Sequence, residues 1–163
     1  LFFLATWPSY PFEWERGEDR LMLISVGTGT WNRQRDVEKV KGQRVWDWAR
    51  EIPSMLIGDA SEQAQFILQT LSNTPTPWHI DREVGDASAG LLADRPLLWY
   101  LRYNAVLDRG ELDGLGLGRL RDRAESLRDL GDARNAGALL EIGRETARHQ
   151  IQARHLPKVF DGG

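Results

Sequence analysis

Serine is the first residue type to consider, because a serine held in a sharp turn can act as the nucleophile of an ester hydrolase. Ser25-Val26-Gly27 matches the second half of the Gly-x-Ser-x-Gly elbow. The elbow also needs a glycine two residues before the serine, so that the hydroxyl is exposed, but Leu23 occupies that position. The remaining serines lie outside the pattern: Ser9, Ser54, Ser61, Ser72, Ser88 and Ser126. The sequence therefore assigns no nucleophilic serine.

Gly27 and Gly29 follow an apolar run and could begin a phosphate-binding loop. A dinucleotide loop needs a third glycine where Asn32 stands, and a Walker loop needs Gly-Lys-Ser/Thr, which the chain lacks. We expect no helix directly after these residues, so no helix N-terminus is offered to a phosphate. The pattern predicts a structural turn rather than a nucleotide site.

Histidine could supply a base or a zinc ligand. His149 and His155 are six residues apart, which places them on different faces of a helix, and no His-Glu-x-x-His occurs. His79 and Asp81 could form a base and its orienting carboxylate, but no nucleophile accompanies them. We predict no zinc site and no catalytic histidine.

The acidic residues have an alternative role as calcium ligands. One acidic group falls in a single predicted loop but lacks the order of an EF-hand: Asp81, Glu83, Asp86 and Asp94. A second group is interleaved with arginines and predicts ion pairs on an exposed helix face: Arg119, Arg121, Arg123 and Arg128 with Asp122, Glu125 and Asp129. Asp161-Gly162-Gly163 resembles the aspartate half of a serine–aspartate dyad, but its position predicts a frayed tail. No catalytic, cofactor-binding or metal-binding residue and no cofactor is assigned.

Composition excludes several further classes. The chain has 163 residues, with 21 Lys and Arg against 24 Asp and Glu, a formal net charge of −3. Such a balance argues against a nucleic-acid binder that works by bulk attraction. Cysteine is absent, which excludes disulfides, thiolate nucleophiles and iron–sulfur clusters. The length fits one domain, residues 1–163, with a core of its own.

The elements that would position these residues can be read from apolar spacing. A short, mostly apolar run predicts a buried strand at 21–26, and an aromatic, partly alternating stretch favours a second strand over 97–107. Leu56, Ala60, Ala64, Ile67 or Leu68, and Leu71 define one face of a helix over 54–72. Residues 7–19, 31–45 and 78–96 predict loops, 45–49 continue in a helix-like pattern, and 108–110 predict a turn. The aromatic residues Trp7, Tyr10, Phe12 and Trp14 are expected to pack the first loop down.

Two helices are expected after the second strand. The first carries Leu117, Leu120, Ala124 and Leu127 on one face. The second begins after an N-cap, Asp132, and ends at Pro157. Its apolar positions include small residues that allow a close approach to a neighbour: Ala136, Leu139, Leu140, Gly143, Ala147 and Ile151.

The chain opens on an apolar stretch that is too short for a membrane span and lacks the features of a signal peptide. We interpret it as a helix or strand of a longer protein that begins before Leu1. Since no targeting signal is visible, the cytoplasm is only the default location.

Three pieces of the chain resemble bacterial patatin-like phospholipases. They are the strand and Gly-Thr-Gly turn in Glu18–Thr30, the late strand in Arg95–Asn104, and the closing helix in Glu141–Ala153 with His155–Pro157. The resemblance implies α/β architecture: part of a three-layer patatin-like fold, mostly helical, with about two strands of a larger sheet. In that family a serine in an elbow attacks a lipid ester, and an aspartate in an Asp-Gly-Gly/Ala motif activates it.

This chain departs from the family because it contains neither the elbow nor the glycine-rich oxyanion loop. The resemblance places the catalytic aspartate before Leu1, so no catalytic residue carries over, and Gly27 and Gly29 correspond to a structural turn. The leading hypothesis is therefore the C-terminal part of a patatin-like lipid acyl hydrolase, inactive alone. Its expected partners are the missing catalytic half or a second copy of the chain. The alternative is a non-catalytic, mostly helical interaction module with grooves lined by Trp46, Trp48, Phe66 and Trp99.

Overall fold

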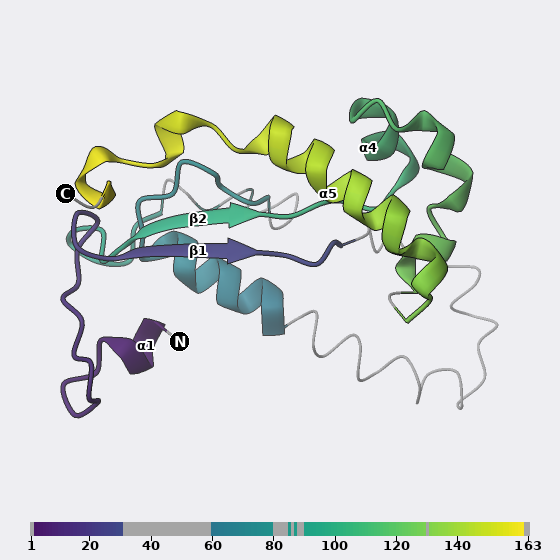
Figure 1. The fold of residues 1–163 in the computed structure, drawn as a ribbon. Helices are drawn as coiled ribbons and strands as arrows, with labels where there is room; N and C mark the ends of the chain where they lie inside the picture. Colours follow the sequence, from purple (N-terminus) through teal and green to yellow (C-terminus); the bar gives the residue numbers. More distant parts are fainter. Residues whose placement is uncertain are drawn as a thin grey trace. The chain divides into compact units, whose positions relative to one another are not determined.

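The computed structural model describes residues 2–30, 60–79, 85, 87, 90–129 and 131–161. These residues fall into two compact units, and the division crosses both strands of the sheet (Figure 1). The first unit contains residues 2–24 and the described residues from 60 to 101. The second contains residues 25–30 and the described residues from 102 to 161.

Several sequence predictions lie outside the described residues. They concern the loop 31–45, the segment 45–49, the first part of the helix predicted over 54–72 with Leu56, and the acids Asp81, Glu83 and Asp86. No helix in the described part of the chain combines the length and hydropathy that a membrane span requires.

The sheet consists of two parallel strands, β1 (Met22–Val26) and β2 (Trp99–Tyr103). Near their start the N–H of Trp99 donates to the carbonyl of Leu21 at 2.8 Å. Both strands are rich in leucine, β-branched or aromatic side chains, which suit a pleated surface. The predicted α/β character and the presence of both strands are confirmed. The predicted burial of the first strand is wrong, because no residue of β1 is buried.

The second strand is shorter than the predicted run 97–107, because β1 ends at Val26 and the segment after it pairs with the later residues only at Thr30. The edge of the second strand that faces away from β1 has a different partner at Asn104. There the backbone binds the side chain of Gln150 instead of a strand. A single bridge between Thr30 and Val106 is the last parallel pairing beyond the two strands.

In the first unit, buried Leu98 and Tyr100 of the β2 region pack with Phe2 of helix α1 (Phe2–Ala5). Half-buried leucines complete this cluster: Leu21, Leu23, Leu68, Leu71 and Leu97. The other edge of β2 binds the backbone of Asn73, whose N–H donates to Leu98 and whose carbonyl accepts from Tyr100.

Residues 60–70 are helical, but the predicted apolar face is partly wrong. Ala60, Ala64 and Ile67 are exposed, whereas Gln69 is buried. The reason is that Gln69 Nε2 donates to the carbonyl of Trp78 at 3.1 Å, and Gln69 Oε1 accepts from the Trp78 N–H. A polar side chain can be buried when a loop satisfies both of its groups.

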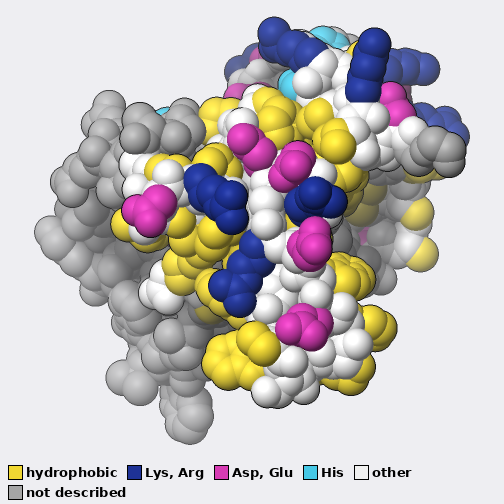
Figure 2. Space-filling view, turned by 90° about the vertical axis from the view of Figure 1, so that its left-hand side faces the viewer, with side chains coloured by type: hydrophobic (Ala, Val, Ile, Leu, Met, Phe, Trp, Pro, Cys, Tyr) yellow, Lys and Arg dark blue, Asp and Glu magenta, His cyan; other side chains and the backbone are white. Residues whose placement is uncertain are grey.

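The loop over 7–19 is confirmed, but its aromatic side chains do not pack it down. Phe12 contacts the rings of Tyr10 and Trp14 at centroid distances of 5.6 and 6.0 Å. Trp7 and Phe12 nevertheless remain 61% and 62% exposed. On the face shown in Figure 2, hydrophobic side chains reach the surface among acidic and basic ones.

The second unit has the larger of the two described cores. Its eight buried residues come from the whole stretch after β2: Leu107, Leu112, Leu117, Leu120, Ala124, Leu127, Ala138 and Ile142. The four positions predicted from 117 to 127 are all buried, as expected. They are carried by 3₁₀ turns over Gly118–Arg123 and Ser126–Arg128 rather than by an α-helix, which corrects the prediction.

The predicted turn at 108–110 is instead the start of helix α4 (Arg109–Gly114). Asp108 caps this helix, because its side chain accepts from the N–H of Glu111 at 2.9 Å. Helix α4 is followed by Gly116 at φ +73°, a conformation that breaks the helix and leads into the 3₁₀ turns.

Helix α5 (Ala136–Gln150) follows a 3₁₀ turn over Ala133–Asn135. The predicted cap is confirmed only for this 3₁₀ turn, where Asp132 accepts from the N–H of Arg134 at 3.0 Å. The N-cap position of α5 itself is Asn135, whose side chain makes no capping bond, so the prediction for the α-helix is corrected. The predicted end at Pro157 is wrong, because Ile151 is already extended. A proline prevents a helix from continuing through it, but it does not require the helix to reach it.

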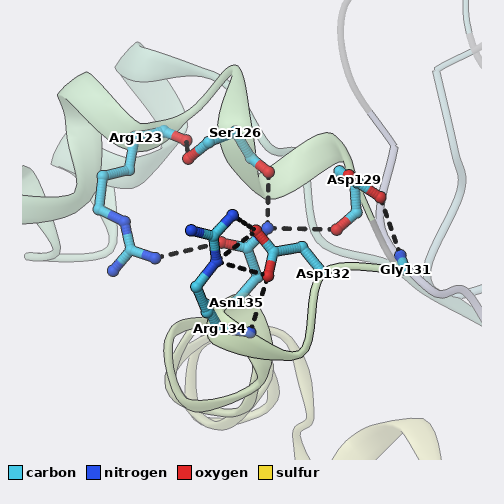
Figure 3. A network of polar contacts seen from close by, with 7 residues as sticks. All are labelled: Arg123, Ser126, Asp129, Gly131, Asp132, Arg134 and Asn135. Carbon is cyan, nitrogen blue, oxygen red and sulfur yellow. Dashed lines mark hydrogen bonds and ion pairs between the residues drawn. The ribbon is translucent and has the colours of Figure 1, made fainter.

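Asn135, at the start of α5, joins the helix to the preceding 3₁₀ turns (Figure 3). Its buried amide Nδ2 donates to the carbonyls of Ser126 and Asp129 at 2.6 and 3.2 Å, and its Oδ1 accepts from Arg123 at 3.1 Å. The other three arginines form ion pairs, but only Arg128 pairs with an acid of the predicted group at helical spacing; Arg119 and Arg121 pair with acids outside it, which corrects the prediction for them. The pairs are Arg119–Glu141, Arg121–Asp113 and Arg128–Glu125.

Candidate functional site

The Gly27–Gly29 turn is built around the side chain of Asn104, which is buried. Asn104 Oδ1 accepts from the N–H of Gly29 at 2.9 Å. A Cβ on Gly27 would lie 2.2 Å from the same oxygen, and Gly29 has φ +102° with Leu107 Cδ1 only 3.1 Å from its Cβ position. Both glycines are therefore required by geometry, and the turn has the structural role predicted for it.

The backbone of Asn104 is held from the other side by Gln150, the last residue of α5. Its N–H donates to Gln150 Oε1 at 3.2 Å, and its carbonyl accepts from Nε2 at 2.8 Å. One amide side chain thus takes the place of a neighbouring strand. This contact fixes the end of α5 beside the end of β2.

Tyr103 and His155 form a buried polar pair next to this contact. The Tyr103 hydroxyl lies 3.1 Å from His155 Nδ1, and the two rings stack with their centroids 6.0 Å apart. Burial lowers the pKa of His155, and the nearby Arg154 charge lowers that pKa further. Burial also raises the pKa of Tyr103. Both side chains are therefore neutral near pH 7, and the hydroxyl can donate to the imidazole.

A groove of about 310 Å³ lies between the Gly27–Gly29 turn, residues 103–107 and α5. All of its lining residues belong to the second unit. The wall on α5 contains Leu139, Gly143, Ala147 and Thr146. No charged side chain is among the residues that line it. The groove is largely apolar, and its lining contains no carboxylate, histidine, lysine or serine.

A second cavity, of about 880 Å³, lies in the first unit between residues 13–20 and Arg95. Its walls carry acidic and basic side chains side by side, and Arg20 lies 3.6 Å from both Glu15 and Asp19. Charges of opposite sign at this spacing neutralise one another in water. The walls carry four acidic and three basic side chains, so their charges are nearly balanced.

Ser25 lies on β1, where its Oγ accepts a hydrogen bond from Arg102 at 2.7 Å. A guanidinium group has no acceptor, so Arg102 cannot take the proton from the hydroxyl. The contact orients Ser25 without activating it.

The structure does not bring the histidines together. His79 and His149 are exposed, whereas His155 is buried against Tyr103. Among the residues that the structure describes, no group of three or more acidic or histidine side chains is arranged to hold a metal ion. Asp94 and Asp161 are described, while Gly162 and Gly163 are not.

Sequence reasoning missed Asn104, Thr146 and Gln150. Asn104 carried a usable signal, because it is a polar residue inside a largely apolar and aromatic run, and buried polar residues are informative. Thr146 and Gln150 carried none, since a threonine and a glutamine on a helix are typical of an exposed face.

Comparisons of the chain with protein-family models, curated proteins and solved structures found no match.

Proposed function

We propose that this chain is the C-terminal part of a patatin-like lipid acyl hydrolase. The observation that carries the proposal is the construction of the segment from β1 through the Gly27–Gly29 turn. In this segment a strand leads directly into a turn in which Gly27 is required by contact with Asn104 and Gly29 by its φ. The two strands also run parallel and in the order in which the resembling pieces occur.

The state of the sheet also supports the proposal. Parallel sheets normally have more strands and covered faces. In the described part of the chain β1 pairs with β2 alone, and two of its side chains, Ile24 and Val26, are 47% and 75% exposed. Exposed apolar side chains on a parallel strand mean that a face of the sheet is left uncovered, which suits packing against another segment.

Lipid ester hydrolysis in this proposal requires residues that the chain does not contain. Ser25 is bound to Arg102 and has no base there, and the sequence contains no Gly-x-Ser-x-Gly elbow. The nucleophile, the activating aspartate and the oxyanion donors would therefore come from a separate catalytic segment. This chain would complete the sheet of that segment through β1.

The test compares the chain alone with the chain extended by the segment that its reading frame encodes upstream. Both are treated with a fluorophosphonate probe and with a medium-chain p-nitrophenyl ester. We expect no labelling and no turnover by the chain alone, and a labelled serine with turnover by the extended protein. An extended protein that neither labels nor hydrolyses would contradict the proposal, as would labelling of the chain alone.

Association through β1 is tested by producing the two segments as separate polypeptides and measuring their co-elution. Val26→Lys should abolish co-elution, because it places a charge on the exposed strand. Val159→Lys is the matched control, since Val159 is also an exposed valine, at 60%, but lies in a C-terminal 3₁₀ turn. In the absence of its partner the chain is expected to self-associate, and a stable monomer would count against this surface.

The interaction-module hypothesis has less support. Trp46 and Trp48 lie outside the described residues, and neither Phe66 nor Trp99 lines either cavity described above. A reading frame that starts at or near Leu1 would favour this hypothesis.

A further inference from the structure

The chain beyond helix α5 is anchored at one side chain. We call residues 152–161 the C-terminal strap, which is the yellow end of the ribbon in Figure 1. His155 is the one buried residue of the strap, at 4% exposure. Leu156 and Val159 of the strap are 43% and 60% exposed. Burial therefore fixes the strap through His155.

The hydrogen bonds of the strap lead to the same residue. In the described part of the chain, its backbone bonds all close within the strap, in the 3₁₀ turns Ala153–His155 and Lys158–Phe160. A side-chain bond to another element joins His155 Nδ1 to the Tyr103 hydroxyl of β2 at 3.1 Å, and the two rings stack. Docking of the strap therefore depends on the contact between His155 and Tyr103.

Protonation of His155 would weaken this contact in two ways. Nδ1 would become a donor, so it could no longer accept a hydrogen bond from the Tyr103 hydroxyl. The imidazolium charge would also be buried, with the positive charge of Arg154 nearby. In a released strap the imidazole is in water, where neither penalty applies.

The ionisable groups around the ring favour its neutral form. Burial is the larger cause of the lowered pKa of His155, and the charge of Arg154 on the same 3₁₀ turn is the smaller. From β2, Tyr103 presents a hydroxyl that is uncharged near pH 7, since burial raises its pKa. The other ionisable side chains of the strap and of the last turn of α5 are exposed to water: Arg148, His149, Lys158 and Asp161.

We propose that the C-terminal strap is an acid-sensitive device, docked on β2 through neutral His155 and released when this imidazole takes up a proton, while the core of the second unit stays folded. Release uncovers Tyr103, which lines the groove beside α5. The device depends on the His155–Tyr103 contact alone, so it holds whether or not the chain belongs to a hydrolase.

The direction and steepness of the response follow from proton linkage. The pKa of His155 is lower in the docked strap than the 6.5 of a free imidazole. The ratio of docked to released strap is therefore highest above pH 6.5. It falls as the pH decreases from there through the docked pKa, by at most about tenfold per pH unit, because one proton is taken up.

The first experiment follows the backbone of the complete chain by NMR between pH 7 and pH 5. The heteronuclear NOE of Val159 and Phe160 should be that of a rigid backbone at pH 7 and that of a mobile one in acid. The value for Ile142, in the buried cluster, should stay unchanged. A strap that is mobile at pH 7, or rigid at every pH at which α5 is folded, would overturn the proposal. Simultaneous loss of order in the strap and at Ile142 would overturn it too.

The second experiment moves the midpoint of release. Arg154→Gln removes the positive charge that disfavours the imidazolium, so the strap should be released at a higher pH than in the wild type. Lys158→Gln is the matched control, because it removes the same charge from an exposed position of the strap. Its midpoint should equal that of the wild type. Equal midpoints for the two variants would contradict protonation of His155 as the trigger.

The third experiment removes the proton acceptor. His155→Phe keeps an aromatic ring for Tyr103 but cannot take up a proton, so the strap should have the same mobility at pH 7 and pH 5. His149→Gln is the control, because His149 is exposed on α5, and it should keep the wild-type transition. A pH-dependent transition that persists in His155→Phe would refute the device. If the phenylalanine strap is mobile at both pH values, the wild-type profile and Arg154→Gln decide.

Discussion

The two compact units place their apolar side chains differently. In the second unit, eight residues between Leu107 and Ile142 form one buried cluster. In the described part of the first unit, the buried cluster consists of Phe2, Leu98 and Tyr100. The aromatic residues of the loop 7–19 are mostly exposed, including Trp14 at 50%. A larger share of the apolar residues is therefore buried in the second unit than in the N-terminal loop.

The two units are alike in how a glutamine side chain is satisfied by backbone atoms. Gln69 in the first unit and Gln150 in the second each satisfy both of their amide groups on a backbone segment. The contrast between the units therefore concerns apolar burial rather than hydrogen bonding. Four predictions test this contrast, beginning with the largest effect.

Leu127→Ala should have the largest effect. Leu127 is completely buried in the second unit, so its truncation removes transfer energy and leaves a cavity, at a cost of about 2–5 kcal/mol. Phe12→Ala in the aromatic loop should change the free energy of unfolding by less than about 0.5 kcal/mol, because Phe12 is exposed. Chemical denaturation of both variants gives the comparison. Similar losses for the two would show that the loop is buried in solution.

Gly27→Ala should be the next most destabilising change. The new Cβ would meet Asn104 Oδ1 at 2.2 Å, and this oxygen is held by the Gly29 N–H, so relief requires breaking that bond. We expect a loss of about 1–3 kcal/mol. Gly114→Ala is the control, because nothing lies within 4 Å of its Cβ position and its φ is ordinary. Equal losses of unfolding free energy for Gly27→Ala and Gly114→Ala would contradict this explanation.

The sequence could predict features that depend on local spacing. The strand at 22–26 lies within one mostly apolar run, and the spacing of a buried face is kept by Leu117, Leu120, Ala124 and Leu127. The sequence predicts Asp132 as the cap of the last helix, and Asp132 caps the 3₁₀ turn that leads into that helix. Each of these features is determined by residues a few positions apart.

The features that failed depend on contacts between distant segments. The spacing of three and four that buries Leu120 and Ala124 fits 3₁₀ turns as well as an α-helix, so spacing could not choose between them. Likewise, the apolar pattern of 60–70 could not show that Gln69 would bind Trp78. The groove was hidden for the same reason: α5 has an apolar face, but only the packed structure shows that part of this face stays open.

His155 should give a smaller effect that depends on pH. Its pKa is lowered in the folded chain by burial first and by Arg154 second, so folding favours the neutral imidazole. The stabilisation is complete above the unfolded pKa of about 6.5 and is lost as the pH falls from there through the folded pKa. His155→Gln should therefore reduce the fall in stability between pH 7 and pH 5.

The matched control for this profile is His79→Gln in the first unit. His79 is exposed, so its replacement should leave the difference in unfolding free energy between pH 7 and pH 5 as in the wild type. Equal effects of the two substitutions on the pH profile would argue against burial of His155 as the cause.

The smallest effect is expected from surface ion pairs, one from each unit. Arg119 pairs with Glu141 in the second unit, and Arg20 lies 3.6 Å from Glu15 in the first. The hydrogen bond from Arg119 lowers the pKa of Glu141, but both partners are in contact with water, where screening removes most of the gain. Glu141→Gln and Glu15→Gln should leave the denaturation midpoint unchanged within error at 0.15 M salt. A clear loss for Glu141→Gln alone would mean that charge pairing, and not only apolar burial, separates the second unit from the first.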